Sequence, residues 1–254
     1  MAVLTEKQIK YGFDYYHKDE KQLKSVVEVS EYDGEDKLMI NCTQLDEDYS
    51  AKDKKRILQE WCTFLVEHPD IFTELMFCTR MPQELFDAVC AQRRLKKLHI
   101  KWGVYPDISK LENLQELEYL HIGSGRSVSR LEPISRLVNL VALSIENFQQ
   151  IDDYAPLANL KHLESLALEG DFAAPKILKV QSLEFLRHMK QLCFFSFLTA
   201  KVIDKDYSPI LELNNLEHLT LKSCKEVKQL YPEFVKLPKL KYGTVLERPE
   251  LYEK

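Results

Sequence analysis

Histidines, cysteines and glycines would carry any catalytic or metal chemistry in this chain, and their spacing indicates none. The seven histidines are scattered, at His17, His68, His99, His121, His162, His188 and His218. The stretch "GSGRSV" has Val128 where the third glycine of a dinucleotide-binding G-x-G-x-x-G motif would stand. No P-loop, H-E-x-x-H or G-x-S-x-G motif occurs, and the seven glycines form no phosphate-cradling loop. The sequence therefore predicts a protein that is not an enzyme and uses no cofactor.

Composition and cysteine spacing indicate a globular protein of a reducing compartment. Of the 254 residues, 45% are hydrophobic and 30% are charged, as in soluble domains. The net charge of −5 gives no general attraction to nucleic acid, and no run of 18 apolar residues would span a membrane. The start, "MAVLTEKQIKYGF", lacks the pattern of a signal peptide, and the six cysteines contain no C-x-x-C pair. We therefore expect a cytoplasmic monomer with buried, reduced thiols.

The elements that position the remaining candidate residues come from an internal repeat. The pattern L-x-x-L-x-[LIF] occurs at Leu95/Leu98/Ile100, Leu117/Leu120/Ile122, Leu140/Leu143/Ile145, Leu163/Leu166/Leu168, Leu192/Phe195/Phe197 and Leu216/Leu219/Leu221. Weaker copies stand at Phe72/Leu75/Phe77 and Leu240/Gly243/Val245. Successive copies are 22 to 24 residues apart, except for one interval of 29. A fixed period of this length predicts a solenoid.

Each half of the period predicts one wall of that solenoid. The last two apolar residues of the pattern are two apart, as in a half-buried strand. Ahead of most copies stands a second phrase, as in "PDISKLENL", "EPISRLVNL", "APLANLKHL", "SPILELNNL" and "PEFVKLPKL". Its apolar residues recur at steps of three, which suits a short 3₁₀ turn on the opposite wall. One unit has a single hydrophobic face, so the units must stack, with their strands forming one parallel sheet.

Together the two phrases resemble the leucine-rich repeat, and "IDDYAPLANLKHLESLALEG" is close to the 22-residue repeat of internalin-like bacterial proteins. The resemblance covers about residues 70–246. It implies an α/β solenoid, a right-handed superhelix with a curved parallel sheet, in a bacterial protein. The family usually has Asn or Cys eight residues after the first leucine, where this chain has Gly103, Gly125, Phe148, Asp171, Ala200 and Cys224. We therefore expect irregular turns after the strands.

The first 70 residues differ from the repeats and predict an N-terminal α+β cap. "VVEVSEYDGEDKLMINC" alternates around Asp33-Gly34, which predicts a hairpin. "SAKDKKRILQEWCTFLVEHPD" opens at Ser50 and places Trp61 on its apolar face, which predicts an amphipathic helix. A cap over residues 1–70 would shield the end of a repeat domain over residues 71–254, with about eight repeats. The alternative is that residues 1–70 are a separate functional module, an enzyme or ligand-binding unit, with the repeats as its recognition arm.

The exposed sheet face carries the candidate binding residues, because the third and fifth residues of each L-x-x-L-x-L point away from the core. These columns, and the seventh position beside them, bring residues of different repeats into one patch. A basic and aromatic group lies toward the N-terminal end, an aromatic group toward the C-terminal end, and small residues flanked by acids lie between them. The candidate partner-binding residues are Lys97, His99, Lys101, Tyr119, His121, Glu146, Glu169, Phe194, His218 and Tyr242.

These columns predict a protein partner held on the concave face. Aromatic anchors beside small residues are typical of interaction hot spots. His99 over His121 would begin a metal site, but two histidines do not complete a tetrahedral shell, and we expect no metal. Lys97 and Lys101 are too short a basic stripe for nucleic acid. The six extra residues in the 29-residue repeat fall in an insert at residues 170–190, which either packs as a bulge or lines a binding edge.

Overall fold

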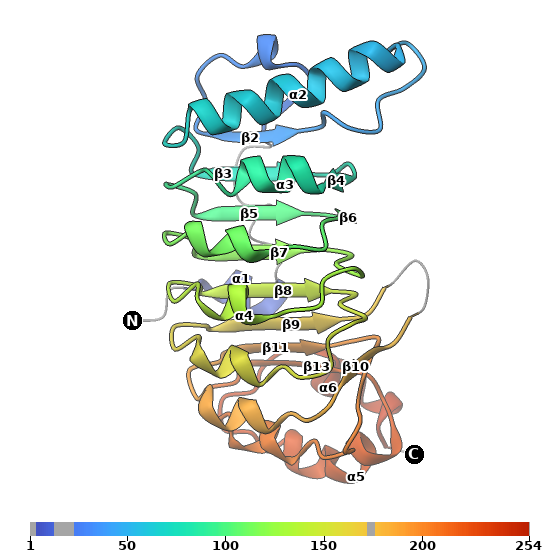
Figure 1. Ribbon diagram of the computed structural model, residues 1–254. Coiled ribbons are helices and arrows are strands. Elements are labelled where there is room, and N and C mark those ends of the chain that lie inside the picture. Colours follow the sequence, from blue (N-terminus) through green and yellow to red (C-terminus); the bar gives the residue numbers. More distant parts are fainter. Residues whose placement is uncertain (1–3, 13–22, 172–175, 254) are drawn as a thin grey trace.

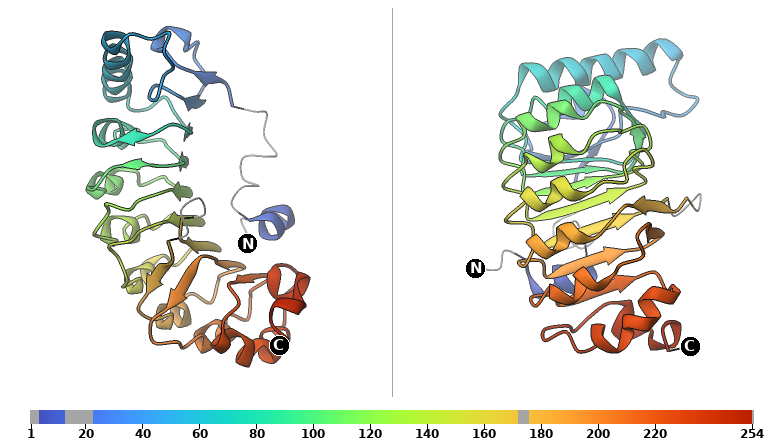
Figure 2. Two further views of the ribbon diagram at one scale, coloured as in Figure 1. Left: turned by 90° about the vertical axis from the view of Figure 1, so that its right-hand side faces the viewer. Right: turned by 60° about the horizontal axis from the view of Figure 1, so that its bottom comes forward.

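The computed structural model describes residues 4–12, 23–171 and 176–253. Most of these residues form stacked repeats (Figure 1), and the stack curves into an arc (Figure 2). One parallel sheet runs the length of the arc. Its nine strands lie in the spatial order β1 (Ser25–Val26), β2 (Lys37–Ile40), β3 (Glu74–Phe77), β5 (Lys97–Ile100), β7 (Tyr119–Ile122), β8 (Ala142–Glu146), β9 (Ser165–Glu169), β11 (Phe194–Phe197) and β13 (His218–Leu221). The sheet faces the hollow of the arc, as the side view shows (Figure 2).

Helices and 3₁₀ turns line the outer, convex wall. In chain order they are α2 (Ala51–Glu67), α3 (Gln83–Val89), η3 (Ser109–Asn113), α4 (Glu132–Ser135), η4 (Ala155–Asn159), η5 (Glu184–His188), η6 (Ser208–Glu212) and α5 (Lys225–Phe234). Those labelled η are single 3₁₀ turns, as the three-residue apolar steps predict. The predicted α/β solenoid with its curved parallel sheet is therefore confirmed.

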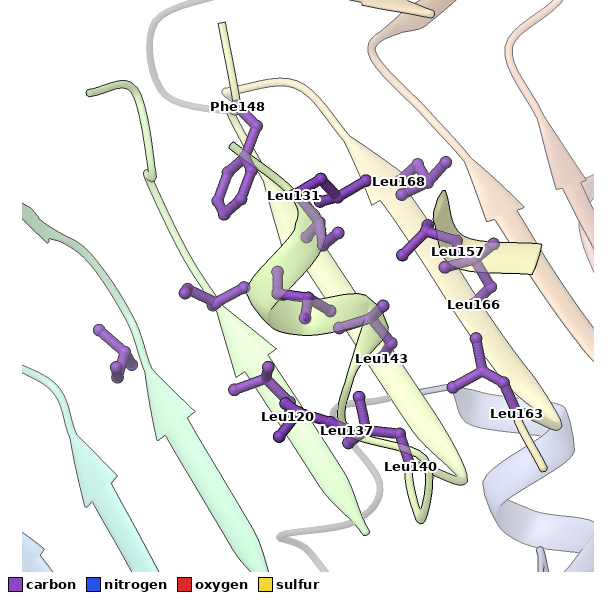
Figure 3. Packing of buried hydrophobic residues seen from close by; sticks show 14 of the residues in the cluster. Leu120, Leu131, Leu137, Leu140, Leu143, Phe148, Leu157, Leu163, Leu166 and Leu168 are labelled. Atoms are coloured by element: carbon purple, nitrogen blue, oxygen red, sulfur yellow. The ribbon is translucent and has the colours of Figure 1, made fainter. Parts of the chain in front are cut away.

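The repeat leucines fill the space between the two walls. Leu163, Leu166 and Leu168 are fully buried, and Leu157 of η4 meets them from the convex side (Figure 3). Ser165 and Ala167, the residues between them, stand on the other face of β9 and pair in register with Ala142 and Ser144 of β8. From Leu157 through Leu160, Leu163 and Leu166 to Leu168 the steps are three, three, three and two residues. They correspond to one 3₁₀ turn, one loop and one strand that all point into the same core.

An aromatic side chain replaces the usual amide in one of the turns after the strands. Phe148 is fully buried, and its ring covers Gly125 of the preceding repeat. A Cβ atom added at Gly125 would lie 2.0 Å from the ring. Nearby, the buried hydroxyl of Tyr105 donates to the carbonyl oxygen of Gly123. Local hydrophobic packing therefore stands where a regular amide ladder would be found.

The N-terminal region joins the same sheet. β2 pairs in parallel with β3, and its Leu38 and Ile40 are fully buried in the core of the repeats. The predicted hairpin around Asp33-Gly34 is wrong, because β1 pairs with β2 in parallel rather than antiparallel. The 3₁₀ turn η2 (Val29–Glu31) and the loop that follows it carry the chain back, so that both strands run in the direction of the repeats.

The helix α2 occupies the place predicted for the amphipathic helix of this region. The Ser50 hydroxyl accepts from Asp53 N–H at 3.1 Å and caps its first turn. Trp61 is fully buried in the core that also contains Phe72 and Leu75. Its indole N–H donates to the Val27 carbonyl at 2.7 Å. The helix is therefore fixed both to the β1 region and to the first repeats.

Two-stranded ribbons and a terminal turn complete the arc. In the insert, β10 (Leu178–Val180) pairs in parallel with β12 (Ala200–Val202), and β4 (Met81–Pro82) pairs with β6 (Gly103–Val104) near the other end. Leu178 and Val180 are buried, whereas Ile177 is partly exposed. After a single bridge at Tyr242 the chain turns into α6 (Thr244–Glu247) and η7 (Pro249–Leu251). Within the described residues no helix is long and apolar enough to cross a bilayer.

Candidate functional site: the concave sheet face

The strand register aligns the candidate residues into columns. Lys97 pairs with Tyr119 and Tyr119 with Ala142, while His99 pairs with His121 and His121 with Ser144. Farther along, Phe194 pairs with Ser165 on one side and with His218 on the other. A bridge from His218 to Tyr242 and the pair Glu146–Glu169 complete the alignment. Adjacent strands are about 5 Å apart, so the ten candidate residues share one surface.

At the N-terminal end of this face a lysine column is arranged around a buried carboxylate. Glu74 is almost fully buried, and its Oε2 lies 3.7 Å from Lys97 Nζ and 3.8 Å from Lys37 Nζ. The Lys97 ammonium also lies 5.4 Å from the centre of the Tyr119 ring, which is a cation–π contact. Lys101, at the end of the same strand, is exposed. Lys97 therefore has a structural task, whereas Lys101 presents its charge to solvent.

The two histidines of this region stack on one another. The rings of His99 and His121 lie with centroids 4.3 Å apart and nearly parallel. His121 Nδ1 is 3.0 Å from the hydroxyl of Ser144 in the next column position. No group of three or more histidine, cysteine, aspartate or glutamate side chains in the described part of the chain is arranged to hold a metal ion. The pair thus forms a flat aromatic surface beside the lysines.

Acidic side chains line the edge of the sheet where β8 and β9 end. Burial, together with the negative charges of Asp171 and Glu169, raises the pKa of Glu146 to about 7. Glu169 accepts a hydrogen bond from the Ser196 hydroxyl at 2.8 Å. Asn147 Nδ2 donates to Asp171 Oδ2 at 3.3 Å. The acids flank the small residues as the sequence indicates, and their charges act on one another.

A helix from the N-terminus covers the C-terminal half of the concave face. The helix α1 (Glu6–Tyr11) lies in the hollow of the arc, facing the sheet rather than the convex wall (Figure 2). Leu4 and Ile9 are each only 5% exposed and pack with Tyr119, Val141 and Ala142. Ala142 of β8, with Tyr119 and Val141 beside it, is therefore the floor on which this helix rests.

Polar contacts hold the first residues of this segment, and an aromatic ring packs against its last residue. Glu6 Oε1 accepts a hydrogen bond of 2.7 Å from the Tyr242 hydroxyl, and Lys10 Nζ lies 5.5 Å from the centre of the same ring. The Leu4 N–H donates to Glu164 Oε2 at 3.2 Å. At the other end Gly12 lies on the Phe194 ring, which a Cβ atom at this position would approach to 2.7 Å. Its φ of +72° also favours glycine.

The aromatic candidates under α1 are buried. Phe194 is 5% exposed, His218 is 9% exposed, and their ring centroids are 4.2 Å apart. His218 Nε2 lies 2.8 Å from the Thr220 hydroxyl. Burial lowers the pKa of His218 to about 4, while Glu247 and the backbone of α1 act in the opposite direction. These two side chains therefore contact a segment of their own chain, and Tyr242 remains half-exposed beside them.

The role of residues 4–12, and of the rim residues that contact them, was not predicted from the sequence. Val141, Glu164 and Cys193 contact the N-terminal segment. They directly precede their strands and so lie outside the third, fifth and seventh positions of the repeats. A groove of about 560 Å³ continues from Glu164 along this rim, lined by Lys96, Glu116, Glu118, Asn139, Val141, Lys161, His162, Glu164 and Gln191. A local signal for α1 was present: Thr5 and Gln8 form a capping box, and Leu4 and Ile9 flank it.

Comparison with known proteins supports the architecture. The sequence matches no family model and no curated protein. Among solved structures, a leucine-rich repeat protein of Leptospira interrogans is similar over 82% of this chain and 50% of that one, with 17% identity and a TM-score of 0.52. The internalin inlF of Listeria monocytogenes is similar over 68% of this chain and 53% of that one, with 17% identity and a TM-score of 0.43. The chain spans about half the length of both. The repeats, the continuous parallel sheet and the likeness to the Leptospira protein together identify the fold of the chain as a leucine-rich repeat solenoid.

Proposed function

We propose that this chain is a non-catalytic binding protein that holds another protein on its concave sheet face. The observation that carries the proposal is the register of the strands, which brings side chains from separate repeats into continuous columns. Solenoids generally use such extended concave surfaces for recognition. In this proposal the chain is a monomer in a bacterial cytoplasm. It acts there as a scaffold, as a regulator or as the neutralising partner of a toxin. Glu146 and Glu169 border the face, and no step of such a function needs a cofactor.

The two ends of the face favour different chemistry in the partner. Lys101 presents an exposed cationic side chain beside the stacked pair of His99 and His121, which suits an acidic or polar edge. At the other end Phe194 and Tyr242 suit an apolar side chain, which reaches Phe194 only when the N-terminal segment that covers its ring has moved aside. Charges at the edge of an interface mainly set the association rate and its salt dependence, whereas buried aromatic contacts mainly set the dissociation rate.

The test begins with capture of the partner by the tagged full-length chain and its identification by mass spectrometry. Binding kinetics are then compared between the wild type and Lys101→Glu. We expect association to slow about 3- to 10-fold at low salt and the difference to shrink as salt is added. Lys97 is the poorer choice, because reversing its charge would place a second carboxylate beside buried Glu74.

A matched control places the same charge change on the opposite wall. Lys236 follows α5 and is exposed, so Lys236→Glu alters the net charge equally without touching the concave face. The proposal requires Lys101→Glu to slow association more than Lys236→Glu does. If both variants associate like the wild type, and Phe194→Ala leaves the lifetime of the complex unchanged, the concave face is not the binding surface. Attention would then move to the described part of the insert, residues 176–190, and to residues 23–70.

A further inference from the structure

The N-terminal segment Leu4–Gly12 is seated on the sheet as a bound peptide would be. Every strand that it contacts lies more than 100 residues away in sequence. Its contacts combine two aliphatic side chains on a floor of small and aromatic residues with a carboxylate bonded to Tyr242. This is the helix-in-groove mode of peptide recognition, in which the apolar face of a short helix is laid against a complementary surface.

The segment carries its own signal for helix formation. The Thr5 hydroxyl accepts from Gln8 N–H, and the Gln8 side chain accepts from Thr5 N–H at 2.9 Å, which completes a capping box. Leu4 and Ile9 occupy the two positions of a hydrophobic staple around this box. A helix of six residues is nevertheless marginal in water without a surface to rest on. The concave face therefore selects a sequence that is biased toward a helix and completes its folding.

The segment is held separately from the main core. Leu4, Ile9, Tyr119, Val141 and Ala142 form a small apolar cluster, distinct from the large cluster that contains the repeat leucines. Leaving the face would expose this small cluster and break the hydrogen bonds of Glu6 and Leu4, but it would not open the space between the two walls. Two aliphatic anchors must also offset the ordering of the whole segment. Because few contacts are set against the cost of ordering the segment, another helix can replace it on the face.

We propose that α1 is a built-in competitor for the partner, and that the face between Tyr119 and Tyr242 is a receptor for a short amphipathic helix of a second protein. This inference rests on the proposed function and specifies its C-terminal half. The incoming helix carries two aliphatic residues placed as Leu4 and Ile9 are, and an acidic residue in its first turn to meet Tyr242. It binds by taking the place of α1. Its apparent affinity is therefore proportional to the fraction of molecules in which the face is uncovered.

A peptide with the sequence of residues 4–12, LTEKQIKYG, tests this without the natural partner. It is acetylated, which keeps the first amide N–H, and carries fluorescein at its C-terminus. Its affinity is measured by fluorescence anisotropy for the full-length wild type and for full-length Leu4→Asp/Ile9→Asp, in which the resident helix is released. We expect binding at least about 10-fold tighter in the variant, because self-competition is removed. Tyr11→Asp is the matched control, because the Tyr11 side chain is 56% exposed. This variant should bind the peptide as the wild type does.

Three further measurements establish where the peptide binds, whether α1 has left the face and whether the solenoid remains folded. Adding Ala142→Gln to the released variant fills the floor of the receptor and should abolish peptide binding. In the released variant, the pKa of His218 followed by NMR should rise from about 4 toward the ordinary value of about 6.5, showing that α1 has left. Unchanged far-ultraviolet circular dichroism would show that the solenoid remains folded.

The proposal is overturned if a folded, released variant fails to bind the peptide, because α1 would then be a fixed part of the fold. It is also overturned if the wild type forms a dimer that the Leu4→Asp/Ile9→Asp change dissolves, because the occupant would then be a second copy. Failure of the proposed function is a separate result. It would appear as partner association insensitive to Lys101→Glu and a complex lifetime insensitive to Phe194→Ala, whereas the peptide assay involves neither the partner nor Lys101.

Discussion

The rings of Phe194 and His218 lie with centroids 4.2 Å apart on neighbouring strands, and both are buried where the N-terminal helix covers the sheet. A histidine in this position is held neutral, because burial lowers its pKa to about 4. Glu247 of α6 and the backbone of Ile9 and Lys10 favour the protonated form, but they do not outweigh burial. The N-terminal helix and the protonation state of this ring are therefore linked.

Acidification is expected to destabilise the protein through His218. Its pKa in the folded state lies below the unfolded value of about 6.5, so its contribution is fully present above pH 6.5 and is lost as the pH falls toward 4. Between pH 7 and pH 4.5 the loss should be about 2–3 kcal/mol. Urea unfolding at both pH values, for the wild type and for His218→Gln, separates this loss from the titration of carboxylates. Equal losses in the two proteins would refute the role of His218.

Removing the indole of Trp61 is expected to cost about 3–5 kcal/mol of unfolding free energy. The side chain is fully buried and donates a hydrogen bond to Val27, which joins α2 to the β1 region. The control is Trp102→Ala, because Trp102 is only half-buried and should cost clearly less. Chemical denaturation followed by circular dichroism measures both. Near-wild-type stability of Trp61→Ala would favour the alternative in which residues 1–70 form a detached module.

Gly125→Ala is expected to destabilise the protein by about 1–3 kcal/mol, because the new methyl group would overlap the buried ring of Phe148. Phe148→Leu removes part of that ring and leaves a cavity of its own. In the double variant the methyl group would occupy some of this space. The double-mutant cycle, measured by thermal or urea unfolding, should therefore show a coupling energy that favours the double variant. Strictly additive losses would show that the ring does not constrain Gly125.

Glu146→Gln is expected to stabilise the protein at alkaline pH more than at acidic pH. The pKa of Glu146 is raised to about 7 in the folded state, so its contribution is fully present below about pH 4.5 and is lost as the pH rises through 7. Amide substitution removes this titration. Melting temperatures at pH 5.5 and pH 8.5 provide the test, with exposed Glu116→Gln as the control. A pH-independent difference between Glu146→Gln and the wild type would contradict the raised pKa.

The columns of the sheet were predictable because they depend on a local period. Once Leu166 and Leu168 are assigned to the core, Ser165 and Ala167 must stand on the other face, and the repeat length fixes their neighbours. The hairpin around Asp33-Gly34 failed for a related reason. Its turn signal is local, but burying Leu38 and Ile40 in the continuous core requires β2 to run parallel to β3. Tertiary packing outweighed the preference of the turn.

The position of α1 was not predictable in the same way. The capping box of Thr5 and Gln8 indicates where a helix begins, but no residue near it indicates the surface on which the helix rests. That surface is assembled from Tyr119, Ala142 and residues still farther along the chain, which meet only when the repeats stack. Consequently the face that the sequence presents as wholly open is half-covered in the folded chain.

The way in which the sheet ends at Gly243 also protects the protein against one kind of self-association. Gly243 takes the place of a repeat leucine, with φ at +100° and no room for a Cβ atom against the backbone of Leu219. The chain turns back there, and the Tyr252 hydroxyl donates to the carbonyl oxygen of Leu221 while Leu221 N–H donates to the Thr244 hydroxyl. Polar backbone groups that a foreign strand would otherwise recruit are thus already engaged. This edge is protected against strand addition, so crowding in the cell should not drive these solenoids into fibres through it.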